Sequence, residues 1–318
     1  MIESSTKGLN EVLNTLRDQR DDLLAEAMRV GYARFKVPPL SGPEEFAQVR
    51  DSVFPTRTTY VEAATPRTSF GSDVFSSTNV PASREIAPHN ENSYATHFPG
   101  HLLFYCFEAP TDGGATPVCD VREVLRTIDG SILKEFEERG WALVRNYSSH
   151  LGRPWQEAFA TSEREEVDAY CAAQDVEVNW HGDRLQTRQV RPATVEHPVS
   201  HDRSWFNHVV FWHGSRLMPE IQEVLTREHG QDWPFQTFYG DGSPIPSDVI
   251  DHIASRYAEN TESQPWQIGD LLLVDNLTAA HARQSYQGSR SVVVAMGTPL
   301  QRKGNAAIPA NESRAERG

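Results

Sequence analysis

The apolar residues of this chain are divided among many short runs. Apolar runs such as those at residues 271–274 and 292–296 have the length of a strand and are far too short to span a bilayer. Further strand-like segments occur at residues 101–107 and 141–147, and helical periodicity is found in the first thirty residues and between strands. Many short strands with helices inserted among them predict a mainly β fold with a jelly-roll, cupin-like barrel.

The rest of the pattern predicts one domain that begins with a helix. Apolar residues spaced three and four apart predict an amphipathic helix in residues 1–30, which packs on the barrel. No internal repeat or linker divides the chain, so we expect residues 1–300 to form a single domain. Residues 301–318 are polar and aperiodic, and we expect them to be a disordered tail.

Three local expectations concern segments outside the main strands. Residues 55–88 are rich in Thr, Ser, Pro and Asn and predict a long loop that borders the functional site. Residues 204–212 predict a strand, and Ser247 is expected to cap a following helix. The other predicted elements are strands at 32–37, 118–120 and 270–275, and helices at 121–129, 132–139 and 164–175.

Charge and cysteine content restrict the partners and the compartment. A net charge of −14 argues against nucleic acid and anionic membranes as partners. The first residues lack the basic start and apolar stretch of a secretory signal. Three cysteines with no metal-binding spacing are best explained as free thiols, so we expect a cytoplasmic protein. None of these features predicts an oligomeric state.

Two His-x-Asp/Glu triplets are present, a pattern that can bind metal. With 12 His and 44 acidic residues, about two such triplets are expected by chance, so the pattern alone is weak. His181-Gly-Asp183 lies at a predicted hairpin tip, where a solvated turn is the favoured interpretation. In His89-Asn-Glu91, alternation along a strand would send residues 89 and 91 to one face, so both could reach one ion.

Two further polar residues lie between apolar strands near the end of the chain. His281 could complete a metal site, although a hydrogen-bonded core histidine is the alternative. Arg290 begins an interior strand, where a guanidinium requires an anion, and the alternative is a salt bridge within the protein. Two imidazoles and a carboxylate hold ferrous iron on one face, and an arginine fork suits a small dicarboxylate. Together with His89 and Glu91, these residues suggest an oxygen-activating iron enzyme.

Several segments resemble the taurine dioxygenase and clavaminate synthase-like superfamily. They extend over about residues 30–300 and are Ala87-Pro-His-Asn-Glu-Asn-Ser-Tyr, Phe104-Tyr-Cys-Phe, Gly113-Gly-Ala-Thr-Pro-Val, His197-Pro with Trp205-Phe-Asn207, Val274-Asp-Asn-Leu-Thr-Ala-Ala-His-Ala-Arg and Gly288-Ser-Arg290. The resemblance implies an oxygenase that depends on iron(II), 2-oxoglutarate and molecular oxygen and is built on a double-stranded β-helix. It also implies that His89, Glu91 and His281 are iron ligands and that Arg290 and Thr116 bind 2-oxoglutarate. Related halogenases replace the carboxylate with a small residue, so Glu91 argues against halogenation.

The resemblance further implies hydroxylation of an unactivated C–H bond, with succinate and carbon dioxide as coproducts. The same residues would serve desaturation or cyclisation. We expect a small amino-acid-like substrate, free or presented on a carrier protein. Candidate pocket residues are Asn79, Trp205, Asn207 and Arg283. The alternatives are an ordinary loop residue for Asn79, a core Trp for Trp205 and a structural ion pair for Arg283. A jelly-roll binding protein without redox chemistry and a zinc hydrolase with two His and one Glu are the competing classes.

Overall fold

The computed structural model describes residues 8–54, 56–58, 67–77, 80–148, 153–230 and 232–310. Its helices are α1 (Leu9–Asp18), α2 (Arg20–Val30), α3 (Pro43–Val53), α4 (Val121–Thr127), α5 (Gly130–Arg139), α6 (Trp155–Phe159), α7 (Arg164–Ala173), η1 (Gly214–Arg216), α8 (Pro219–His229) and α9 (Ser247–Glu259). Its strands are β1 (Tyr32–Lys36), β2 (Val74–Ser76), β3 (Ile86–His89), β4 (His97–Glu108), β5 (Asp112–Gly113), β6 (Val118–Asp120), β7 (Trp141–Tyr147), β8 (Val176–His181), β9 (Arg184–Arg191), β10 (Thr194–Glu196), β11 (Arg203–Trp205), β12 (Phe235–Tyr239), β13 (Thr261–Glu262), β14 (Asp270–Asp275), β15 (Ala279–Arg283), β16 (Tyr286–Gln287), β17 (Ser291–Lys303) and β18 (Ala306–Pro309).

Two sheets form the predicted jelly-roll core. The larger has the order β1-β14-β4-β17-β18-β10-β11, with β2 also paired to β17, and the smaller has the order β13-β6-β15-β3. The long strands β4, β14 and β17 pair antiparallel in the middle of the larger sheet. This arrangement confirms the mainly β fold with a double-stranded β-helix core and inserted helices.

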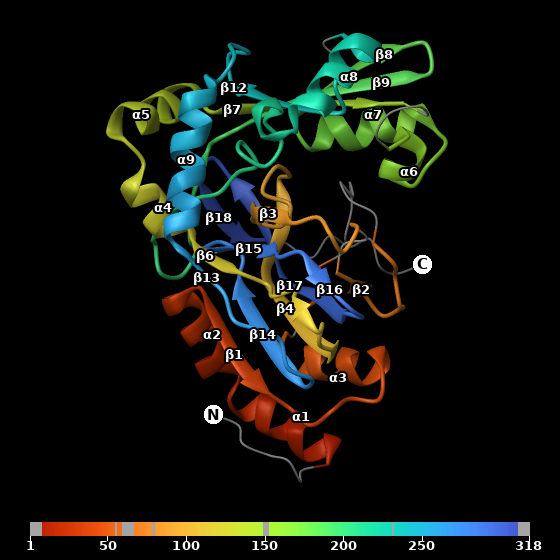
Figure 1. The fold of residues 1–318 in the computed structure, drawn as a ribbon, viewed down its shortest axis with the longest axis vertical. Coiled ribbons are helices and arrows are strands. Elements are labelled where there is room, and N and C mark those ends of the chain that lie inside the picture. The colour runs from red at the N-terminus through yellow and green to blue at the C-terminus, as the bar shows by residue number, and fades with distance from the viewer. Residues whose placement is uncertain are drawn as a thin grey trace.

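Alternation along β4 explains how the larger sheet covers two cores. Leu102 and Phe104 face one side, where they pack with Val118 and Ala279 of the smaller sheet. Leu103 and Tyr105 face the other side, where the helices α1 and α3 cover them. Because neighbouring side chains of a strand point to opposite faces, one strand serves both layers. Figure 1 shows the N-terminal helices packed along this outer face.

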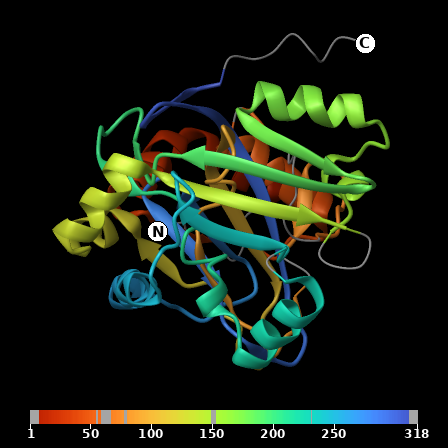
Figure 2. The ribbon, with the colours of Figure 1, turned by 90° about the horizontal axis from the view of Figure 1, so that it is seen from above.

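A third sheet, with the order β12-β7-β9-β8, lies at the opposite end of the molecule from α1 (Figure 1). Helix α7 packs on it and closes a small apolar core of its own, and Figure 2 shows the sheet from above. The hairpin β8–β9 turns at His181-Gly-Asp183, and Asp183 pairs with Arg164 in solvent. The solvated-turn interpretation of this triplet is therefore confirmed. None of the helices that the structure describes has the length and apolarity needed to cross a membrane.

Several local predictions need correction. The helical segment predicted for the first thirty residues is divided into α1 and α2 at Gln19, and residues 1–7 lie outside the described residues. The described parts of segment 55–88 are not entirely loop, because β2 pairs with β17 and β3 pairs with β15. Ser247 is the first residue of α9, and Pro246 occupies the cap position without a side-chain hydrogen bond.

Two larger corrections concern segments 204–212 and 301–318. Only β11 is a strand, since the Asn207 side chain bonds the Ala193 carbonyl and the Val209 amide and turns the chain. Residues 301–309, predicted to be part of a disordered tail, instead complete β17 and form β18. Leu300 and Ala307 stabilise this hairpin because they pack in an apolar cluster. The polar composition of residues 301–318 gave no indication of this packing. Residues 311–318 lie outside the described residues.

Candidate active site

Two histidines from opposite ends of the sequence face each other across paired strands. His89 is the last residue of β3 and His281 lies in β15, and the antiparallel register places them directly opposite each other. Their ring centroids are 4.3 Å apart. Because β15 also pairs with β6, His281 is fixed in the middle of the small sheet. The sequence predicted that these histidines would converge, and the register explains how they do so.

Glu91 joins the two histidines by a route other than strand alternation. β3 ends at His89, so Glu91 lies in the turn that follows. Its Oε2 is 3.8 Å from His281 Nε2, and potential ligand atoms of His89, Glu91 and His281 all lie within 4.8 Å of one another. The side chain of Asn276 holds the backbone of Glu91 and thereby directs the carboxylate back toward the histidines.

Both imidazoles are in the form that binds metal. Burial lowers the pKa of His89 and takes the pKa of His281 well below its usual value, so both rings are neutral at pH 7. His89 Nδ1 lies 3.0 Å from the Ala87 carbonyl and donates to it, which leaves Nε2 as the ligand atom. Two neutral imidazoles and a carboxylate form a donor set that fits a ferrous ion.

Arg67 contacts the carboxylate of this cluster. Its Nη2 lies 2.6 Å from Glu91 Oε2, and both side chains are buried. The predicted site-bordering segment 55–88 supplies it, but nothing in the local sequence distinguishes Arg67 from other loop residues. The guanidinium offsets the charge that Glu91 would otherwise leave unpaired in the interior.

Arg290 lies in the same pocket without a carboxylate partner among the described residues. Its guanidinium donates to the Gly114 carbonyl at 2.8 Å, to Ser77 Oγ at 2.8 Å and to Thr116 Oγ1 at 3.3 Å. Burial lowers its pKa to about 10, with Arg283 as a smaller cause. A charged group held only by neutral acceptors in a buried pocket is suited to an anionic ligand.

Thr116 is arranged to donate to the same ligand. Its hydroxyl oxygen accepts from Arg290 and from Trp266 Nε1 at 3.1 Å, so both of its lone pairs are used. The hydroxyl hydrogen is left for an acceptor in the pocket. Gly114, beside it, has a φ of +68°, and an added Cβ would lie 2.6 Å from Pro110 and 3.2 Å from the Arg290 side chain. Glycine at this position therefore allows Arg290 to approach the turn.

One pocket reaches from the two histidines of the cluster to Arg290. Its space, with the open solvent at its mouth included, is about 350 Å3, and its lining residues are Arg67, Ser77, Ile86, His89, Phe104, Thr116, His281, Ala282, Arg283, Arg290 and Val294. The lining combines aromatic and aliphatic side chains with three arginines, which supply positive charge. This composition suits a small anionic molecule next to a metal ion.

The four candidate substrate residues have different positions. Arg283 lines the pocket, and its guanidinium donates to the carbonyls of Val80, Pro81 and Arg84. Trp205 is fully buried against Phe136 in the core. The other two are Asn207, which is buried in the turn described above, and Asn79, which lies outside the described residues. Neither Trp205 nor Asn207 lines the pocket.

A histidine that sequence reasoning missed lies beside the cluster. His208 is buried, its Nδ1 is 2.6 Å from Ser93 Oγ, and its ring centroid is 5.9 Å from that of His89. Phe211 packs against both histidines, and Trp212 stacks on His208. The turn at Asn207 brings these rings together. The continuous strand that the sequence predicted for residues 204–212 would have kept them apart.

Comparison with known proteins identifies the class. The profile of the family "Taurine catabolism dioxygenase TauD, TfdA family" matches residues 2–296, and the chain belongs to this family. It is a non-haem iron(II)- and 2-oxoglutarate-dependent dioxygenase, with molecular oxygen as the other cosubstrate. It is similar to the dapdiamide synthesis protein DdaC of Enterobacter agglomerans, with 34% identity over 88% of this chain and 85% of the relative. A clavaminate synthase-like protein of Arabidopsis thaliana is 27% identical over 90% of this chain and 86% of its own.

Solved structures show the same fold at low identity. A taurine dioxygenase from Burkholderia xenovorans superposes with a TM-score of 0.50 at 13% identity, over 93% of this chain and 87% of that chain. An asparagine oxygenase, solved with Fe(II), a hydroxyasparagine and succinate, gives 0.51 at 12% identity, over 91% and 83% of the two chains. These similarities support the predicted double-stranded β-helix.

Proposed function

We propose that His89, Glu91 and His281 hold the iron(II) of this dioxygenase and that Arg290 and Thr116 hold the distal carboxylate of 2-oxoglutarate. The observation that supports this most is the shared pocket, because His89 and His281 line it together with Arg290, and the Glu91 carboxylate lies within 4.8 Å of both histidines. A dicarboxylate that reaches both ends of the pocket would use the metal at one end and the arginine fork at the other.

The protein's own part is to bind and orient the reactants, since iron(II) with 2-oxoglutarate and oxygen supplies the oxidation. The bond from His89 to Ala87 fixes the tautomer of that ligand. Arg67 offsets the charge of Glu91. Phe104 packs against His281 with ring centroids 5.3 Å apart and, with Val294, excludes water from the pocket wall.

We infer that the reaction is hydroxylation of a small amino-acid-like substrate. Arg283 is the arginine of the pocket lining that is assigned neither to Glu91 nor to 2-oxoglutarate, and its charge favours a substrate that carries a carboxylate. The similarity to a protein named for dapdiamide synthesis favours a biosynthetic role. The substrate is either free or tethered to a carrier protein. Desaturation or cyclisation is the second candidate, because the same ligands and pocket would serve it.

The test is anaerobic addition of iron(II) and 2-oxoglutarate, followed by visible spectroscopy. We expect a weak charge-transfer band in the wild type and none in His281→Ala, because the variant lacks one ligand. A wild type without the band, or a His281→Ala protein that keeps it, would reject the site.

A panel of amino acids and their carrier thioesters, scored by substrate-stimulated succinate formation, then tests the substrate class. The proposed substrate class would be rejected if no amino acid or thioester stimulated succinate formation and compounds that lack both groups did.

A further inference from the structure

The turn between β14 and β15 binds the segment that carries two of the proposed metal ligands. Asn276 Oδ1 accepts from the Glu91 amide at 2.7 Å, and its Nδ2 donates to the carbonyls of Glu91 at 3.0 Å and Pro99 at 2.8 Å. In return, Asn90 Nδ2 donates to the carbonyls of Asn276 at 2.7 Å and Ala279 at 3.1 Å. The His89–Glu91 segment and this turn are therefore joined by bonds in both directions.

The Asn276 amide takes the place of a neighbouring strand. β3 ends at His89, so the peptide groups of Glu91 have no ladder partner beyond that point. The side-chain amide of Asn276 accepts from the N–H of Glu91 and donates to its C=O, as a paired strand would. Asn276 is fully buried, and the loss of either bond would leave a buried polar group unpaired.

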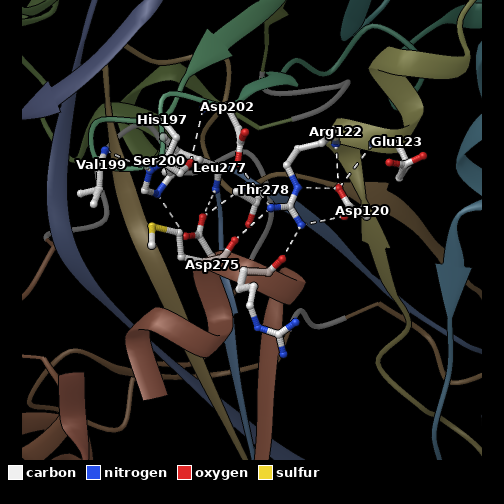
Figure 3. A network of polar contacts seen from close by, with 12 residues as sticks. Asp120, Arg122, Glu123, His197, Val199, Ser200, Asp202, Asp275, Leu277 and Thr278 are labelled. Atoms are coloured by element: carbon white, nitrogen blue, oxygen red, sulfur yellow. Dashed lines mark hydrogen bonds and ion pairs between the residues drawn. The ribbon is translucent and has the colours of Figure 1, made fainter. Parts of the chain in front are cut away.

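The turn that presents Asn276 is itself held in place (Figure 3). Asp275 Oδ1 accepts from the amides of Leu277 and Thr278, and Oδ2 lies 3.2 Å from His197 Nε2. His197 Nδ1 accepts two backbone amides, so its proton is on Nε2 and is donated to Asp275. Burial raises the pKa of Asp275, but the His197 hydrogen bond and the nearby histidines outweigh it and hold the pKa below its usual value. A charged, fully bonded Asp275 makes the turn a rigid support.

We propose that Asn276 is a positioning residue for metal binding, which sets the backbone of Glu91 so that its carboxylate meets His89 and His281. This inference rests on the proposed metal site. Among the described residues, Asn276 alone bonds the peptide groups of Glu91, and Arg67 bonds the carboxylate. Without Asn276, Glu91 would be free to turn away while the two histidines stayed opposite each other.

Cobalt(II) binding to the full chain tests this without a substrate. The variant Asn276→Asp keeps the size and one acceptor but loses both donors, and Asn276→Ala loses all three bonds. We expect each to weaken Co(II) affinity about 10- to 100-fold, the usual effect of losing a residue that orients a ligand. We also expect their d–d absorption to move toward that of Glu91→Ala, which lacks the carboxylate.

Asn146→Asp is the matched control. Asn146 also donates to a backbone carbonyl, that of Trp233 at 2.7 Å, and accepts from Gln186 at 2.9 Å, but it lies in β7 of the third sheet and does not contact the ligand segment. It should lose stability, measured by urea unfolding, and keep the wild-type Co(II) affinity and spectrum. Wild-type affinity and spectrum in folded Asn276 variants, or an equal loss in Asn146→Asp, would overturn the proposal.

A measurement on the wild type covers the case in which the Asn276 variants do not fold. In the metal-free protein, the Glu91 amide should exchange its hydrogen slowly, because it is buried and bonded to Asn276. Fast exchange would overturn the proposal. A wild type that binds no Co(II) would instead reject the metal site itself, so the two failures are distinct.

Discussion

Arg290 allows a quantitative test that separates a ligand-binding arginine from a structural one. The change is Arg290→Met, which keeps much of the volume and removes the charge. Burial lowers the pKa of Arg290 to about 10, and the difference from its ordinary value corresponds to about 3 kcal/mol at 1.36 kcal/mol per pKa unit. Since the folded-state pKa is below the unfolded one, the charged form is disfavoured in the folded protein. This cost is fully present below about pH 10 and is relieved as the pH rises above it.

Two effects on stability oppose each other in Arg290→Met. Removal of the buried charge contributes up to about 3 kcal/mol to the free energy of unfolding at pH 7. Loss of the bonds to Gly114, Ser77 and Thr116 costs about 1 kcal/mol each. We therefore expect a net change within about 1 kcal/mol, measured by urea unfolding without metal or cosubstrate. Breaking a structural buried ion pair would instead cost about 3–5 kcal/mol.

The effect of Arg290→Met on 2-oxoglutarate binding should be much larger. Truncating one partner of a buried charge pair costs about 2–5 kcal/mol, which is about 30-fold to several thousand-fold in the dissociation constant. The measurement is anaerobic titration of the iron(II) protein, with the charge-transfer band as the signal. A variant that binds 2-oxoglutarate within threefold of the wild type, or that loses more than about 3 kcal/mol of stability, would refute the reasoning.

Two further predictions concern the core. Trp205→Ala should lower the free energy of unfolding by about 3–5 kcal/mol and leave 2-oxoglutarate affinity unchanged, because Trp205 packs on Phe136 and does not line the pocket. Urea unfolding and 2-oxoglutarate titration measure the two effects, and weaker binding at unchanged stability would contradict this prediction. Burial raises the pKa of Cys106 to about 11 and that of Cys119 to about 12, so both are protonated at pH 8. Iodoacetamide followed by mass spectrometry should label them only after denaturation, and rapid labelling of the native protein would show that the thiols are accessible.

The sequence predicted the site correctly where residues with metal- or anion-binding side chains lie in or beside recognisable strands. His89 and His281 were predicted to meet, and the pairing of β3 with β15 places them opposite each other. Arg290 was predicted to need an anion, and it has no carboxylate partner among the described residues. The reason given for Glu91 was wrong, because an asparagine side chain and not strand alternation sets its direction. Such a contact joins positions 185 residues apart, and no local pattern reveals it.

Local composition misled the prediction where distant partners decide the structure. The tail residues 301–309 are polar, yet β18 pairs with β17 and packs through Ala307. Segment 204–212 has strand-like residues, but Asn207 bonds the backbone and turns it. Tertiary contacts overrode strand propensity there, as they often do. Arg67 lay in the segment that was expected to border the site, but only the fold shows which of its residues reaches the carboxylate.

The three arginines of the pocket have a consequence for the rate at which 2-oxoglutarate arrives. The chain as a whole carries a net charge of −14, so a dianion approaching from a distance meets repulsion before it meets Arg67, Arg283 and Arg290. Salt screens the long-range repulsion beyond about 10 Å at 0.1 M, whereas short contacts inside the pocket are screened much less. Capture of the dianion should therefore quicken as ionic strength rises, the reverse of an enzyme that steers its ligand electrostatically.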